Sequence, residues 1–286
     1  MTEVLNDTSI NTTYLTELEG PRFYLCGGLE LPYADGMQTP TAKKLRQLLA
    51  LLLTKAGQPV TRETLAQELY GNTLPRSCAT TLQTYILQLR RCTGDNGDGI
   101  PQKSNKSILR TIQTGYKFDI DPYAVDVLRF IDLVRGTCLG PNDDEQQLRR
   151  TLATLDAAFS LIRGPILCDV VCGFELDLFS IQYEELRRMA HLRRIDTSLM
   201  LGQHQQTLVE LAGLSLTDPF SEDFARRRIV ALYRCGRTGE ALAACQTLNQ
   251  ALVSALGIEP GPQTKRLHQM VLQGDPALLN PRWMMS

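Results

Sequence analysis

The sequence predicts a mainly α protein in which an N-terminal α+β domain is followed by an all-α domain. Strand and turn signals gather before residue 120, whereas apolar residues at helical spacing fill the chain after it. The charge changes at the same place: residues 21–120 hold 13 Lys and Arg against 7 Asp and Glu, and residues 121–286 hold 17 against 20. A basic module joined to a mildly acidic one indicates a polyanionic partner for the first; chance clustering of charge is the alternative.

The first 20 residues are polar, hold four acids and no Lys or Arg, and show no strong hydrophobic period. We expect them to form a flexible tail. The following stretch, "PRFYLCGGLELPYADG" (21–36), places apolar residues around glycine turns and predicts one or two short strands.

The first long helix is predicted over "TAKKLRQLLALLLTKAGQPV" (41–60), because leucines recur there at spacings of three and four. Thr41 is placed to cap its N-terminus, and Gly57 and Pro59 end it. The leucines expected on its buried face are Leu45, Leu48, Leu49, Leu52 and Leu53.

A second helix is predicted over "TRETLAQELYGN" (61–72). Thr61, followed by the acid Glu63 and by Thr64, is a good helix start, and Gly71 ends the helix. The residues expected on its buried stripe are Leu65, Ala66 and Leu69.

The third helix, "RSCATTLQTYILQLRRC" (Arg76–Cys92), carries no Asp or Glu. Its expected buried face is Ala79, Leu82, Ile86 and Leu89. The opposite stripe is Thr80, Thr84, Gln88 and Arg91, flanked by Thr81, Gln83, Tyr85 and Arg90. Hydroxyl, amide and guanidinium groups read base edges and hold phosphates, and an acid among them would be repelled by DNA. A polar face in contact with solvent is the alternative, which the flanking elements and the domain charge disfavour.

A turn-rich segment and a hairpin follow. In "SILRTIQTGYKFDI" (107–120), β-branched and aromatic residues alternate around a Thr-Gly turn. Strands, three helices and a hairpin are the element order of a winged helix-turn-helix. The polar and basic residues that the wing would offer to DNA are Lys103, Lys106, Arg110, Gln113 and Lys117, while Tyr116 and Phe118 anchor the hairpin to the core.

Lys43 and Lys44 begin the first long helix, where they could donate to a phosphate beside the helix N-terminus. Two lysines in contact with solvent explain the same pattern equally well.

The chain from residue 120 onward reads almost entirely as helices separated by short turns. "ALYRCGRTGEALAACQTL" (231–248) has the form of one two-helix unit, with small residues where the helices cross. Such pairs of antiparallel helices predict an α-solenoid of tetratricopeptide type.

Other classes of protein lack support in the sequence. No apolar run has the length of a membrane helix, and no secretory signal is recognisable, so we expect a cytoplasmic protein without a membrane partner. The eight cysteines are scattered; Cys168 and Cys172 have no second ligand pair, so we expect buried thiols rather than a metal. The sequence has no nucleophile triad, no metalloprotease motif and no phosphate-binding glycine loop, which predicts no catalytic residues and no cofactor.

The N-terminal motifs "TAKKLRQLLALLLTKAGQPVTRETLAQELYG", "ATTLQTYILQLRR" and "TGYKF" resemble the OmpR-type winged-helix domain. The second half, with "LDAAFSLIRGPILCDV" and "ALGIEPGPQTKRLHQMV", resembles the bacterial transcriptional activator domain. This pair of halves resembles the Streptomyces antibiotic regulatory protein family over about residues 21–277. The expected organisation is a flexible tail (1–20), a winged helix-turn-helix DNA-binding domain (21–119) and a tetratricopeptide-like bacterial transcriptional activator domain (120–286).

The resemblance implies an activator of a secondary-metabolite (antibiotic) gene cluster. It implies binding to direct repeats in double-stranded promoter DNA, two protomers forming a homodimer on that DNA, and recruitment of RNA polymerase holoenzyme. It assigns the recognition helix to Arg76–Cys92, the wing to Lys106–Phe118, and a polymerase-facing loop to Gly71–Ser77. Leu87 departs from the pattern, because relatives often carry a polar or basic residue there.

These implications give a definite set of site residues. The residues expected to contact DNA are Lys43, Lys44, Arg76, Thr80, Thr81, Thr84, Tyr85, Gln88, Arg90, Arg91, Lys106, Gln113 and Lys117. The residues expected to contact polymerase are Asn72, Thr73, Leu74 and Pro75. A different function stays open for the helical half, which could sense a ligand or a protein and thereby control the DNA-binding half.

Overall fold

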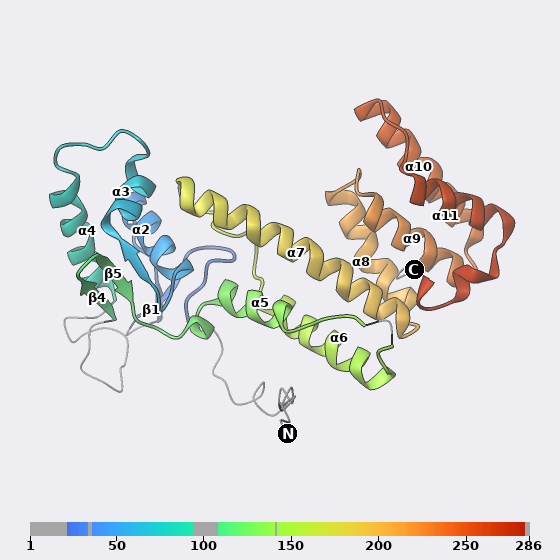
Figure 1. The fold of residues 1–286 in the computed structure, drawn as a ribbon, viewed down its shortest axis with the longest axis horizontal. Helices are drawn as coiled ribbons and strands as arrows, with labels where there is room; N and C mark the ends of the chain where they lie inside the picture. The colour runs from blue at the N-terminus through green and yellow to red at the C-terminus, as the bar shows by residue number, and fades with distance from the viewer. Residues whose placement is uncertain (1–21, 34–35, 94–107, 141, 284–286) are drawn as a thin grey trace, which may run out of the picture. The chain divides into compact units, whose positions relative to one another are not determined.

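The computed structural model describes residues 22–33, 36–93, 108–140 and 142–283. It divides into two compact units (Figure 1), and the predicted mainly α architecture is confirmed. The first unit comprises Met1–Arg129 and Leu161–Ser180, and the second comprises Phe130–Ser160 and Ile181–Ser286.

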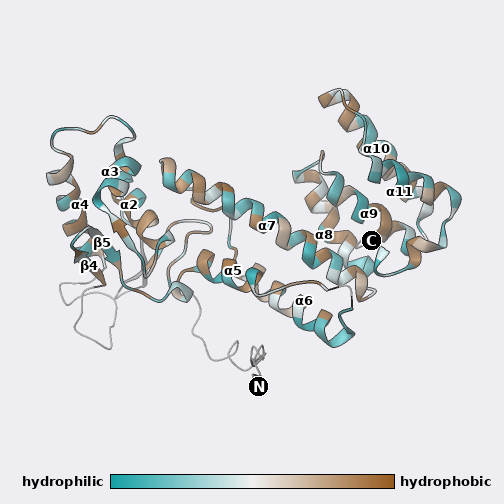
Figure 2. Cartoon of the chain, in the orientation of Figure 1, coloured by the Kyte–Doolittle hydropathy of each residue, from teal (hydrophilic) through white to brown (hydrophobic). Residues whose placement is uncertain are grey.

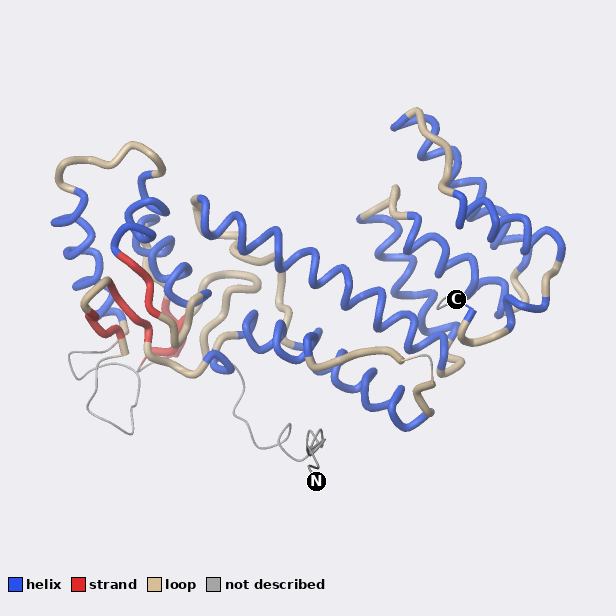
Figure 3. Tube along the Cα trace, viewed as in Figure 1, coloured by secondary structure: helices blue, strands red, loops and turns tan. Residues whose placement is uncertain are grey.

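Among its described residues the first unit holds three complete α-helices and two small antiparallel sheets (Figure 3). One sheet pairs β1 (Leu31–Tyr33) with β2 (Gly36–Gln38). The other has the order β3-β5-β4. Its strands are β3 (Pro59–Thr61), β4 (Leu109–Ile112) and β5 (Gly115–Phe118), and the helices are α2 (Lys43–Thr54), α3 (Arg62–Tyr70) and α4 (Cys78–Cys92).

Helix α2 is the centre of this unit, because it packs against α3, α4 and β5. Leu45 and every residue from Gln47 to Thr54 are buried, and this set includes all the predicted leucines. The predicted cap at Thr41 is wrong: Ala42 is the N-cap and makes no side-chain bond. The carbonyl of Ala42 already accepts from Leu45 and Arg46, so Thr41 lies outside the helix start.

The predicted cap of α3 is confirmed, since the Thr61 hydroxyl accepts from the Thr64 N–H at 3.1 Å. The strand β3 directly before it was not predicted. β3 pairs with β5 of the hairpin, and Thr61 lies opposite Gly115. A Cβ at Gly115 would lie 2.0 Å from the carbonyl oxygen of Val60, so only glycine allows this close approach.

Residues on both sides of the predicted boundary at 119 contribute to the first unit. The buried Asp126 carboxylate accepts from the N–H groups of Leu25 and Cys26, each at 2.9 Å. The Leu167 N–H donates to the Leu25 carbonyl at 2.8 Å. Asp169 accepts from the Leu29 N–H at 3.0 Å and forms an ion pair with Arg46.

Among its described residues, the second unit contains helices and connecting turns but no strand. It contains α6 (Glu145–Ser160), α8 (His204–Thr217), α9 (Glu222–Arg234), α10 (Thr238–Leu256) and α11 (Pro262–Gln273). It also contains the larger parts of α5 (Asp126–Arg135) and α7 (Phe174–Met200), which begin in the first unit.

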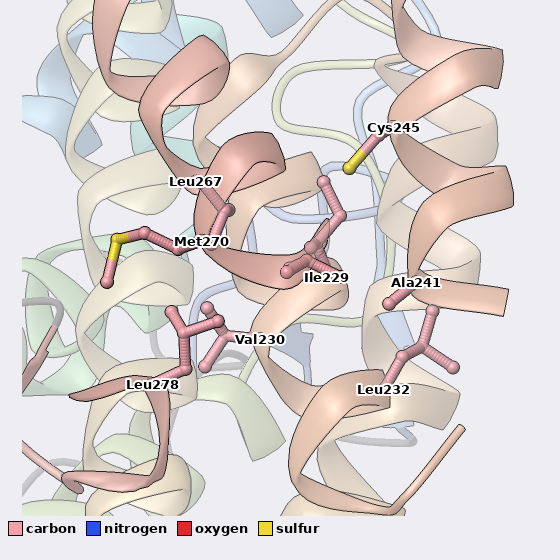
Figure 4. Close-up of a cluster of buried hydrophobic side chains, with 9 residues drawn as sticks. Ile229, Val230, Leu232, Ala241, Cys245, Leu267, Met270 and Leu278 are labelled. Atoms are coloured by element: carbon pink, nitrogen blue, oxygen red, sulfur yellow. The ribbon is translucent and has the colours of Figure 1, made fainter. Parts of the chain in front are cut away.

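Helix α9 packs against α8 and α10, and α11 packs against α10 and α9, as expected for stacked helical pairs. Figure 4 shows the buried cluster between α9, α10, α11 and the final turn. Its labelled members are Ile229, Val230, Leu232, Ala241, Cys245, Leu267, Met270 and Leu278. None of the described helices combines the length and the hydropathy needed to cross a membrane.

Candidate nucleic-acid interface

Helix α4 is held by three apolar side chains. Leu82, Ile86 and Leu89 are each at most 2 % exposed, and the helix packs against α2 and α3. Ala79 was expected to join them but is exposed. It lies in the first turn after an exposed loop, where its single methyl group does not reach the core. The side of the helix that carries Leu82, Ile86 and Leu89 therefore faces the core. Brown and teal stretches alternate along α4 in Figure 2, as expected for an amphipathic helix.

The outward side of α4 and the two residues before the helix carry no acid. The exposed residues here are Arg76, Ser77, Ala79, Thr80, Gln83, Thr84, Leu87, Gln88 and Arg91. The predicted residues Thr81 and Tyr85 are half-buried at the edge of this surface. We call the central members, namely Arg76, Thr80, Gln83, Thr84, Leu87, Gln88 and Arg91, the α4 face. It offers donors, acceptors and two guanidinium groups, which are the chemistry that DNA requires.

The threonine hydroxyls are oriented by the helix itself. Thr84 Oγ1 donates to the Thr80 carbonyl at 3.1 Å, and Thr81 Oγ1 donates to the Ser77 carbonyl at 3.0 Å. Each hydroxyl hydrogen is then engaged, so the outward lone pairs act as acceptors. Such acceptors suit the exocyclic amino groups of adenine or cytosine in the major groove.

The Arg90 side chain makes two hydrogen bonds to the wing that the sequence did not predict. Its Nε donates to the Leu109 carbonyl at 3.1 Å, and its Nη2 donates to Thr111 Oγ1 at 2.7 Å. The guanidinium therefore fastens the last turn of α4 to β4 of the wing. Arg91, next in the chain, is exposed.

The wing forms the predicted hairpin, with Ile112 opposite Gly115. Tyr116 and Phe118 are buried, as predicted. Gln113 is exposed at the turn, whereas Lys106 and Lys103 lie outside the described residues.

Two cations of the wing share one acid. Lys117 Nζ lies 2.7 Å from Asp119 Oδ1, and Arg110 Nη1 lies 2.9 Å from Asp119 Oδ2. The hydrogen bond from Lys117, followed by that from Arg110, lowers the pKa of Asp119. Asp119 thus remains ionised at neutral pH and partly neutralises the positive charge of the wing.

The two lysines that begin α2 differ. Lys43 is exposed, but Lys44 donates to the Leu69 carbonyl and its Nζ lies 5.3 Å from the ring centroid of Tyr70. Burial, followed by the neighbouring Tyr85, raises the pKa of Tyr70, which keeps its hydroxyl protonated. Lys44 therefore supports the end of α3, and Lys43 is the one of the pair that faces solvent.

The α3–α4 loop is exposed at each predicted position from Asn72 to Pro75. Leu74 has 57 % of its surface exposed, which is high for a leucine in a unit with a well-filled core. Together α3, this loop and α4 form a helix-turn-helix, and the hairpin beside it completes the winged form.

Two family models match the chain. Residues 36–118 match "Transcriptional regulatory protein, C terminal", and residues 125–272 match "Bacterial transcriptional activator domain". The chain belongs to the Streptomyces antibiotic regulatory protein family. Members of this family are transcriptional regulators, and the winged helix-turn-helix described above is their OmpR-type DNA-binding domain.

Two relatives are similar to this chain over most of its length. Regulatory protein DnrI of Streptomyces peucetius is 36 % identical over 247 residues, which are 84 % of this chain and 88 % of DnrI. Transcriptional regulator RedD of Streptomyces coelicolor is 33 % identical over 272 residues, which are 92 % of this chain and 76 % of RedD.

A solved structure shows the same fold. Mycobacterium tuberculosis EmbR, in complex with a low affinity phosphopeptide, superposes with a TM-score of 0.77 at 24 % identity. The match covers 92 % of this chain and 68 % of EmbR. It supports the winged helix-turn-helix followed by a helical domain.

Proposed function

We propose that this regulator activates transcription by binding direct repeats in promoter DNA and recruiting RNA polymerase holoenzyme. Its target is a secondary-metabolite gene cluster, and it acts in the cytoplasm. The observation that carries the proposal is the α4 face, where seven exposed positions hold two arginines and no acid.

The α4 face would enter the major groove. Arg76 precedes the helix and Arg91 lies in its last turn, so guanidinium groups stand at both ends of a surface of hydroxyl and amide groups. This arrangement allows the ends to hold phosphates while the middle contacts base edges. Lys43 at the start of α2, together with Gln113 and Lys117 on the wing, would add contacts to the flanking backbone.

The residues Asn72–Pro75 would contact polymerase. This loop joins the two helices of the helix-turn-helix and exposes the apolar side chain of Leu74. A surface leucine flanked by polar residues suits a small protein contact better than a phosphate contact. Two protomers arranged head to tail on direct repeats would present two such loops on one side of the DNA.

DNA binding is tested by fluorescence anisotropy with promoter fragments from the neighbourhood of the gene. Arg91→Ala should weaken specific binding about tenfold and lower the salt slope by about one, since one phosphate contact is lost. Arg149→Ala is the matched control, because Arg149 is an exposed arginine of α6 in the second unit. Equal affinity of both variants and the wild type would contradict the assigned surface.

Recruitment is tested by transcription in vitro with purified holoenzyme. Leu74→Ala should reduce activation while DNA affinity stays unchanged. Leu272→Ala is the control, because Leu272 of α11 is similarly exposed, at 62 %. Full activation by Leu74→Ala would show that polymerase contacts lie elsewhere.

The ligand-sensing alternative gains no particular support from the second unit. One hollow there is lined by Arg188, Ser221, Asp223 and neighbours, and it is open to solvent. Both of its arginines already pair with Asp223: Arg188 Nη2 lies 3.1 Å from Asp223 Oδ2, and Arg226 Nη2 lies 2.6 Å from Asp223 Oδ1.

A further inference from the structure

We propose that Leu87 reads the 5-methyl group of a thymine in the major groove and thereby sets part of the operator sequence. The inference rests on the proposed binding of DNA by α4. It assigns a specific base and a specific atom to the one large apolar side chain of the α4 face.

The position of Leu87 separates it from the other leucines of α4. Leu82 and Leu89 are buried at 2 % and 0 %, whereas Leu87 is 50 % exposed. It lies one turn after Gln83 and Thr84 and one turn before Arg91, and all three of these are exposed. Leu87 is therefore on the middle of the α4 face and contributes little to the core.

The chemistry of a leucine leaves few partners in the major groove. Its side chain has no donor or acceptor, so it cannot recognise the polar edge of guanine, adenine or cytosine. The C5-methyl group of thymine is the apolar feature that base pairs present in this groove. The Leu87 side chain next to that methyl group would remove both apolar surfaces from water.

The neighbours of Leu87 favour such a contact. Thr84 and Gln83 precede it by one turn, and hydrogen bonds from these side chains to adjacent bases would hold the helix close to the base edges. Arg91 follows by one turn and can hold a phosphate. A leucine between groups that bind polar atoms is then enclosed rather than left in solvent.

The test begins with an operator located by footprinting. Each thymine in one repeat is replaced in turn by deoxyuridine, which removes only the 5-methyl group. For the wild-type chain, we expect a three- to tenfold loss of affinity at one thymine of the repeat, in line with burial of one or two methyl groups. A cytosine at that position should bind better when it is 5-methylated.

Variants identify the side chain that contacts the methyl group. Leu87→Ala should bind thymine and deoxyuridine operators equally at that position. Leu74→Ala, which removes an exposed leucine outside the face, should keep the wild-type preference. Thr80→Ser and Thr84→Ser, which remove the other exposed methyl groups of the face, should also keep it.

Three outcomes overturn the inference. Loss of the preference in either threonine variant, with Leu87→Ala unaffected, would assign the methyl contact to threonine. Tight binding that does not depend on any thymine methyl group would refute the proposed role of Leu87 but leave the proposed function standing. No specific binding by the wild-type chain to any promoter fragment would refute the proposed function and the inference together.

Discussion

The backbone N–H of Gly173 donates a 2.6 Å hydrogen bond to the carboxylate of Glu68, 105 residues earlier in the chain. The N–H of Glu175 donates to the same carboxylate at 2.8 Å, and the Gln47 amide donates to it at 3.2 Å. Glu68 lies on α3 of the helix-turn-helix and is 2 % exposed. A carboxylate of α3 thus caps the start of α7, which makes that start part of the first unit.

Glu68→Gln should destabilise the first unit by about 2–3 kcal/mol, because its amide group turns a donor toward buried N–H groups. Chemical denaturation followed by circular dichroism measures the change. Glu63→Gln is the matched control, since Glu63 is exposed in the first turn of the same helix, and it should cost at most about 1 kcal/mol. Equal effects of the two changes would show that the buried Glu68 contributes no more to stability than an exposed acid of the same helix.

Gly173→Ala should also be strongly destabilising. A Cβ at this position would lie 2.3 Å from the Glu68 carbonyl oxygen and 2.9 Å from its carboxylate, so the backbone must move. We expect a loss of about 2 kcal/mol or more, as for other buried clashes. Gly213→Ala on α8 should instead stabilise by about 0.5–1 kcal/mol, since a Cβ there meets nothing within 4 Å. The opposite ranking of the two variants in thermal melts would contradict the geometry at Gly173.

A fragment that ends at Asp119 should lose the protection of its N-terminal segment. It lacks Asp126, which binds the N–H groups of Leu25 and Cys26, and it lacks Asp169, which binds the N–H of Leu29. Hydrogen exchange of these three amides should be at least about tenfold faster in the fragment than in the full chain. Unchanged exchange would indicate that residues 1–119 form a domain complete in itself.

Arg90→Ala should loosen the wing. Removal of the guanidinium leaves the Leu109 carbonyl and the Thr111 hydroxyl without their partner on α4. We expect a cost of about 1–2 kcal/mol and faster exchange of the β4 amides. Arg91→Ala, which removes the exposed neighbouring arginine, should leave stability unchanged. If Arg90→Ala also left stability and β4 exchange unchanged, the bond to β4 would be unimportant for the wing.

Asp119→Asn should tighten non-specific binding to DNA and steepen its salt dependence, because Lys117 and Arg110 lose their shared acid. The pKa of Asp119 is lowered from its ordinary value, so the carboxylate is ionised at both pH 6 and pH 8 and the effect should be the same at the two pH values. Glu259→Gln, which breaks the exposed pair with Lys265 in the second unit, is the control and should not change affinity. A weaker complex for Asp119→Asn would mean that Asp119 positions the wing on DNA.

Local patterns were sufficient to predict most elements of the chain. The spacing of Leu82, Ile86 and Leu89 predicts the buried side of α4, and the Thr61 cap marks the start of α3 because both signals depend only on neighbouring residues. Strand β3 was missed because three residues are too few to show an alternating pattern. It becomes a strand through pairing with β5, more than fifty residues later.

The candidate site was only partly predictable for the same reason. The helical period predicts which residues of α4 are exposed, and the sequence shows that none of them is an acid. These two features identify Thr80, Thr84 and Arg91 as candidate DNA contacts. The bonds of Arg90 to β4 and of Lys44 to Leu69 depend on tertiary structure, so the sequence did not separate these residues from their exposed neighbours Arg91 and Lys43.

Footprinting of the purified chain on promoter fragments across a salt series tests the central claim most directly. We predict protection of two direct repeats about one helical turn apart, with affinity falling about a thousandfold or more between 50 and 200 mM salt. Arg91→Ala should weaken the same footprint without moving it. No footprint at any salt concentration, or weak binding that does not depend on salt, would contradict the account of α4 as a DNA-reading helix.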